Sequence, residues 1–123
     1  MTRRVLDVGN CDPDYMSIAQ FLQTHFAVEV DRAHALDDTL TALRTGQYCL
    51  MLVNRKLDCD YSDGIEIIRR VKADQSLANV PAMLVTNYSE HQDAAVAIGA
   101  ERGFGKLEFN KPETVERLTR FLG

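Results

Sequence analysis

Several residue types are scarce or missing, and each shortage excludes a class of protein. The chain contains no tryptophan and only three cysteines. Cys11, Cys49 and Cys59 are odd in number and show no Cys-x-x-Cys spacing, which argues against a disulfide framework and against a zinc site. No apolar run approaches the roughly 20 residues of a membrane-spanning helix, and the N-terminus lacks a secretory signal pattern. We therefore expect reduced thiols and a cytoplasmic location.

Positive charge is also limited. The sequence has 14 lysines and arginines against 18 aspartates and glutamates, and its net charge of −4 is spread along the chain. A nucleic-acid-binding surface needs Lys and Arg gathered on one face, so we expect neither nucleic acid nor a membrane among the partners. The length of 123 residues, 46% of them hydrophobic, suits one globular domain with one core. We expect this domain to span residues 1–123.

Short apolar runs alternate with helical patterns from one end of the sequence to the other. The expected strands are residues 5–8, 28–30, 49–53, 82–86 and 103–106. Helical spacing of apolar residues begins after Asp12-Pro13, at Leu36, after Asp63-Gly64, at Ser89 and after Pro112. The run at 49–53 is apolar throughout, which is typical of a central parallel strand covered on both faces. The pattern predicts an α/β fold with a parallel sheet between helical layers.

The first helix carries a start signal at Asp12-Pro13. Aspartate is favoured as an N-cap because its carboxylate accepts hydrogen bonds from free backbone N–H groups, and proline fits the first helical turn. We therefore predict that Asp12 caps this helix and binds no metal.

Ligands of doubly wound parallel sheets bind outside the carboxyl ends of the strands. The residues to examine are those that directly follow the expected strands. They are Gly9, Asn10, Asn54, Thr86, Asn87 and Lys106.

These positions lie within a pattern that covers nearly the whole chain. The segments that carry it are VLDV at 5–8, DPD at 12–14, DGIEIIRR at 63–70, PAMLVT at 81–86, and IGA at 98–100 followed by Lys106. In this order and spacing the sequence resembles the receiver domains of two-component response regulators, the CheY-like family. The resemblance implies a flavodoxin-like (βα)5 fold in three α/β/α layers, with strand order 2-1-3-4-5.

In that family, two acidic residues after the first strand and an acceptor aspartate after the third hold Mg²⁺, whose preferred ligands are oxygens. The acceptor carboxylate takes the phosphoryl group, which a Thr or Ser and a Lys also bind. Here the acidic pair falls on Gly9 and Asn10, and the acceptor position falls on Asn54. Thr86 and Lys106 are retained. A neutral amide is a poor nucleophile, so the comparison predicts a pseudo-receiver with weak or absent Mg²⁺ binding and no other cofactor.

Other interpretations of the same residues stay open at this point. Asp58 or Asp60 is a candidate displaced acceptor, and Asp7 or Asp12 is a candidate replacement for the lost carboxylates. A small enzyme or a flavin-binding protein can use the same fold. The sequence has no Gly-rich phosphate loop after the first strand and no evident nucleophile–base pair, so we expect no enzymatic activity.

The resemblance also implies protein partners. They are a histidine kinase or an output protein, or a second copy of the chain that binds through the fourth helix, fifth strand and fifth helix. Residues 94–98 are rich in alanine, which favours close helix approach on that face.

Overall fold

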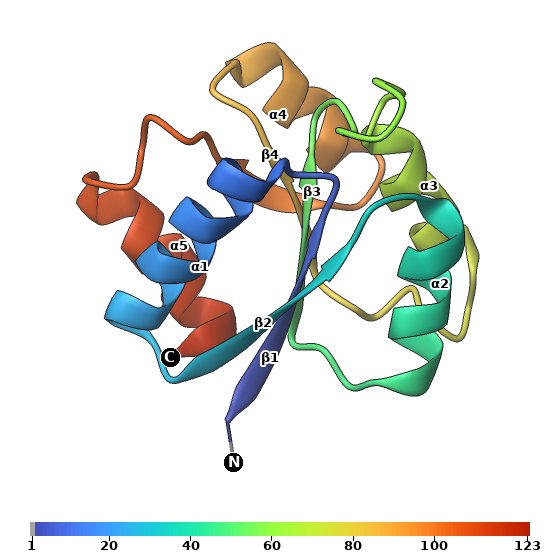
Figure 1. The fold of residues 1–123 in the computed structure, drawn as a ribbon. Coiled ribbons are helices and arrows are strands. Elements are labelled where there is room, and N and C mark those ends of the chain that lie inside the picture. The colour runs from blue at the N-terminus through green and yellow to red at the C-terminus, as the bar shows by residue number, and fades with distance from the viewer. Residues whose placement is uncertain (1) are drawn as a thin grey trace.

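Five strands and five helices alternate along the computed structural model, which describes residues 2–123. The strands are β1 (Arg3–Val8), β2 (Val28–Ala33), β3 (Leu50–Asn54), β4 (Ala82–Val85) and β5 (Glu101–Phe104). The helices are α1 (Asp12–His25), α2 (Leu36–Thr45), α3 (Ile65–Ala73), α4 (Ser89–Ala97) and α5 (Pro112–Leu122). All ladders are parallel and the strand order is β2-β1-β3-β4-β5 (Figure 1), which confirms the predicted fold.

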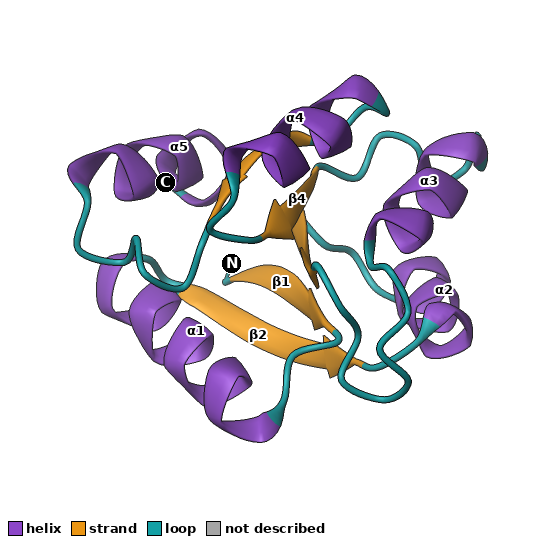
Figure 2. Cartoon of the chain, turned by 90° about the horizontal axis from the view of Figure 1, so that it is seen from above, coloured by secondary structure: helices purple, strands orange, loops and turns teal. Residues whose placement is uncertain are grey.

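Helices cover both faces of the sheet. Viewed onto one edge of the sheet, α1 and α5 lie on one face, and α2, α3 and α4 lie on the other (Figure 2). The central strand β3 alternates between the two layers: Leu50 and Leu52 pack toward α1 and α5, and Met51 and Val53 pack toward the opposite layer. All four side chains are fully buried, which explains the uninterrupted apolar run in the sequence.

The last strand differs from the sequence prediction. It runs from Glu101 to Phe104, two residues earlier than predicted, and Lys106 follows it in a loop. Its residues 101–102 are charged and not fully buried, so hydrophobicity gave no signal there. The ladder between β4 and β5 is also irregular, with a register shift between Met83 and Val85. No helix within residues 2–123 is long and apolar enough to cross a membrane.

The predicted cap of α1 is wrong. Asp12 is the first residue of the helix, Cys11 occupies the N-cap position, and no side chain caps this end. The Asp12 carboxylate instead accepts a hydrogen bond from Arg32 Nη1 at 2.7 Å. Arg32 lies within β2, near its end, so a side chain of this strand holds the carboxylate away from the helix end. Asp12 therefore links α1 to β2.

Candidate functional site

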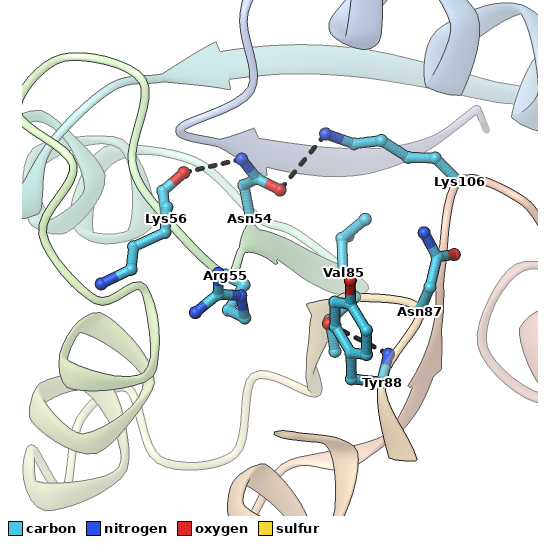
Figure 3. Close-up of a pocket in the computed structure, with 8 residues that line it drawn as sticks. Asn54, Arg55, Lys56, Val85, Asn87, Tyr88 and Lys106 are labelled. Carbon is cyan, nitrogen blue, oxygen red and sulfur yellow. Dashed lines mark hydrogen bonds between the residues drawn. The ribbon is translucent and has the colours of Figure 1, made fainter. Parts of the chain in front are cut away.

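The loops that follow β3, β4 and β5 meet at the carboxyl edge of the sheet and enclose a cavity of about 210 Å³ (Figure 3). Four residues that the sequence placed at strand ends line it together, namely Asn54, Thr86, Asn87 and Lys106. The other lining residues are Arg55, Lys56, Val85 and Tyr88. Gly9 and Asn10 do not line the cavity.

The Asn54 amide has hydrogen-bond partners at both ends. Its Nδ2 donates to the carbonyl oxygen of Lys56 at 2.6 Å, and its Oδ1 accepts from Lys106 Nζ at 3.3 Å (Figure 3). The predicted proximity of Asn54 and Lys106 is therefore confirmed, whereas their roles in signalling stay predictions. Since a carboxylate cannot donate, an ionised aspartate at this position could not make both of these contacts.

Lys106 also binds a residue that the sequence argument missed. Its Nζ lies 2.7 Å from Asp14 Oδ2, in the first turn of α1. The hydrogen bond from Lys106 holds the pKa of Asp14 below its ordinary value. The sequence contained one hint, because Asp14 belongs to the same DPD segment that supports the family resemblance. Nothing in the local pattern pointed to a partner 92 residues away.

Gly9 turns the chain sharply at the end of β1. Its φ of +79° favours glycine, and a Cβ at this position would collide with Leu57. The turn places Asn10 back over the strand, where its Nδ2 donates to Asp7 Oδ1 at 2.6 Å. Both Asp7 and Asn10 are only 1% exposed. Gly9 is thus a glycine that the backbone conformation requires, and Asn10 is a buried partner of Asp7.

Asp7 is a carboxyl group in the interior of the sheet. Burial raises its pKa from 3.8 to about 6, although the hydrogen bond from Asn10 and the nearby charges of Arg32 and Lys106 act in the opposite direction. Buried charges are usually paired with an opposite charge, but the direct partner of Asp7 is the neutral Asn10 amide. Asp7 is absent from the cavity lining.

Thr86 and Asn87 hold the start of α4 and the loop after β5. The Thr86 hydroxyl lies 3.3 Å from His91 Nδ1 and accepts from the Tyr88 backbone N–H at 3.3 Å. Asn87 Oδ1 accepts from the backbone N–H of Leu107 at 3.1 Å. A side chain at Gly105 would overlap Asn87, so glycine permits this close approach. Both polar residues therefore have structural hydrogen bonds of their own.

The two candidate displaced acids lie in the loop between β3 and α3, outside the cavity lining. Asp60 accepts from the hydroxyl and the backbone N–H of Ser62 at 2.6 and 3.0 Å, and these bonds lower its pKa. Asp58 is exposed. Lys56 and Asp63 close the same loop with an ion pair of 2.8 Å. These contacts are typical of turn chemistry.

The residues present do not fit Mg²⁺. Three cationic side chains and no carboxylate line the cavity, whereas Mg²⁺ is reluctant to lose water and needs oxygen ligands, usually including carboxylates. The Lys106 ammonium already donates a hydrogen bond to Asn54 Oδ1. Within residues 2–123, no group of three or more His, Cys, Asp or Glu side chains is placed to hold a metal ion.

The strand order and alternating helices define a doubly wound flavodoxin-like protein. Within this fold class, the chain is similar to several solved structures. A protein described as a response regulator from Chloroflexus aurantiacus superposes with a TM-score of 0.83 at 19% identity, covering 98% of each chain. A sensor protein from Polaromonas reaches 0.81 at 18% identity, over 97% of this chain and 94% of that one. A chemotaxis CheY protein from Vibrio cholerae reaches 0.76 at 19% identity, over 99% and 100%.

The chain therefore has the fold of response-regulator receiver domains over nearly its whole length. No family model and no curated protein matches the sequence. Identities this low establish the fold, and function has to be argued from the residues of the site.

Proposed function

We propose that this protein is a receiver-like signalling module of a two-component or phosphorelay pathway, and that it acts by protein–protein contact without phosphorylation at Asn54. The observation that carries the proposal is the pairing of both ends of the Asn54 amide. An amide offers no carboxylate oxygen to attack phosphorus. Through its hydrogen bonds, Asn54 instead joins the loops that follow β3 and β5.

The charge of the cavity supports the same proposal. Arg55, Lys56 and Lys106 line it without an acid, and the nearest compensating carboxylates lie on α1 and in the loop before α3. A divalent cation brought into this cavity would meet three like charges. Because metal ions offset the charge of a phosphoryl group during transfer, their exclusion removes a second requirement of the reaction.

The first test is incubation of the unmodified protein with acetyl phosphate and Mg²⁺, followed by intact-mass spectrometry. We expect no phosphoryl adduct, and no heat of Mg²⁺ binding by calorimetry. Asn54→Asp alone should still give almost no phosphoryl adduct, because the site still does not bind Mg²⁺. A Mg²⁺-dependent adduct that maps to Asp58 or Asp60 in the unmodified protein would establish a displaced acceptor instead.

A variant with restored acids provides the matched control. Gly9→Asp is a poor choice, since Leu57 blocks a side chain there and the backbone conformation is strained for other residues. Asn10→Asp combined with Asn54→Asp avoids both problems. We expect this double variant to gain measurable Mg²⁺ affinity, because the new carboxylates supply the charge that the unmodified site lacks.

The surface of α4, β5 and α5 is the proposed contact for a kinase, an output protein or a second copy. Ala94 and Ala97 are exposed on α4, and Val96 is 42% exposed beside them, whereas Ala95 is buried in the core. Small exposed side chains let another backbone approach closely. Sedimentation equilibrium should show whether the chain dimerises, and Val96→Lys should weaken any dimer formed through this face without affecting the fold.

A further inference from the structure

Two buried oxygen atoms at the start of the chain have no hydrogen-bond partner within the described residues. They are Asp7 Oδ2 and Asn10 Oδ1. The same two side chains already share one hydrogen bond, from Asn10 Nδ2 to Asp7 Oδ1 at 2.6 Å. If Asp7 is ionised, both remaining oxygens are acceptors and neither can satisfy the other. Leaving a buried polar group without a partner is unfavourable.

We propose that Asp7 and Asn10 form a proton-binding site, in which a proton on Asp7 Oδ2 is donated to Asn10 Oδ1. The pair then has two hydrogen bonds in opposite directions, one from the amide and one from the carboxylic acid. A single proton satisfies both orphaned oxygens. The only covalent change is protonation of one carboxylate oxygen by solvent.

The surroundings of the buried carboxyl group favour its neutral form. Arg32 is its register partner on β2, Leu52 is its partner on β3, and Lys106 and Asp14 act on it from the loop after β5 and from α1. Asp14 disfavours ionisation, and the two cations favour it. Burial at 1% exposure outweighs the cations and raises the pKa of Asp7.

Both nearby cations are held by other acceptors. Arg32 donates to the Asn10 carbonyl oxygen at 2.9 Å and to Asp12 at 2.7 Å. Lys106 is paired with Asp14 at 2.7 Å. Neither Arg32 nor Lys106 makes a hydrogen bond to the Asp7 carboxyl group, so Asp7 is not part of an ion pair.

Protonation of Asp7 is therefore coupled to the contacts that Arg32 and Lys106 make around the cavity at the carboxyl edge of the sheet. When Asp7 loses its proton, the new buried charge attracts Arg32, which holds the loop through Asn10, and Lys106, which holds Asn54. The loop between β1 and α1 and the Lys106 contacts should therefore change together. The transition falls near pH 6, within the range in which cellular pH changes are sensed.

The first test compares the unmodified protein with Asp7→Asn by urea unfolding between pH 4 and pH 8. An Asn side chain supplies an N–H to Asn10 Oδ1 without a proton, so the variant needs no titration. An acid whose pKa is raised on folding contributes full stability below pH 3.8, and that stability is lost as the pH rises to about 6. The folding equilibrium constant of the unmodified protein should fall about 100-fold relative to the variant over this window.

A pH-independent difference between the two proteins would overturn the proposal. Asp12→Asn is the matched control, because Asp12 also contacts Arg32 but lies at the surface. Its difference from the unmodified protein should not show the loss of stability between pH 3.8 and about 6 that Asp7 produces.

The second test reads the carboxyl carbon of Asp7 by NMR in the unmodified protein, so that it does not depend on the variant folding. We expect a titration midpoint near 6, with the Asn10 side-chain amide and the Lys106 signals moving at the same midpoint. A midpoint at or below 4 would refute the shared proton, and static Asn10 and Lys106 signals would refute the coupling. The titration is repeated with Mg²⁺ and with a chelator. A Mg²⁺-dependent displacement of the Asp7 midpoint would show that the orphaned oxygens belong to a cation site.

Discussion

Gln92 provides the sharpest test of how β4 and β5 are joined to α4. It lies on α4 and is 5% exposed, and its Nε2 donates to the carbonyl oxygens of Leu84 at 2.9 Å and of Thr86 at 3.3 Å. Its Oε1 accepts from the backbone N–H of Gly103 at 2.8 Å. One side chain thus joins α4 to β4 and β5 where their ladder shifts register.

Gln92→Leu keeps the approximate volume and removes all three contacts. Each hydrogen bond contributes about 1 kcal/mol, and the buried N–H of Gly103 then lacks its partner at a further cost of about 1–3 kcal/mol. The greater hydrophobicity of leucine offsets part of this loss, at about 1–2 kcal/mol for the buried side chain. The expected net loss is about 2–5 kcal/mol, which corresponds to a decrease in Tm of about 10–20 °C for a domain of this size.

The assay is urea unfolding with amide hydrogen exchange. The exchange rate of the Gly103 amide should increase more than those of the β1 and β3 amides. Gln20→Leu, at an exposed position on α1, is the matched control and should change stability by less than about 0.5 kcal/mol. A loss below about 1 kcal/mol in Gln92→Leu would show that the side chain does not bridge the two strands.

Three further changes test other parts of the structure. Thr114 Oγ1 is buried without a partner among the described residues, so Thr114→Val should stabilise the protein by about 1 kcal/mol in urea unfolding. Lys72 Nζ donates to the carbonyl oxygens of Ala78 and Val80 at 3.0 and 2.8 Å, and Lys72→Met should lower the unfolding free energy by about 2–3 kcal/mol in the same measurement. Asp14→Asn should cost less than about 1 kcal/mol, because its ion pair with Lys106 is partly exposed. Since folding lowers the pKa of Asp14, this difference in stability should be present at neutral pH and disappear as the pH falls below 3.8. Thermal unfolding of both proteins at a series of pH values measures it.

The fold could be predicted because its signals are local. The alternation of apolar runs and helical patterns placed all five strands and helices in order, and the central run at 49–53 matched a strand covered on both faces. The last strand was misplaced because Glu101 and Arg102 carry charge instead of an apolar pattern.

The candidate site was predictable only in part. Strand ends in the sequence identified Asn54, Thr86, Asn87 and Lys106, since residues after parallel strands meet at one edge. The Asp14 contact and the bridging role of Gln92 were not predictable, because they depend on how helices sit against distant strands. The capping role of Asp12 was also predicted wrongly, because competition from Arg32 is a tertiary effect that a capping pattern does not contain.

The Lys106 contacts have a consequence for the order in which the molecule assembles. They join residues 92 and 52 positions apart along the chain, from the first helix, the central strand and the last loop. Contacts of such long sequence separation require closure of large loops, whose entropic cost must be met before the contacts form. We therefore expect them to form after the folding transition state. Substitutions there should accelerate unfolding and leave the folding rate nearly unchanged, so that Lys106 governs the lifetime of the native state more than the speed of its formation.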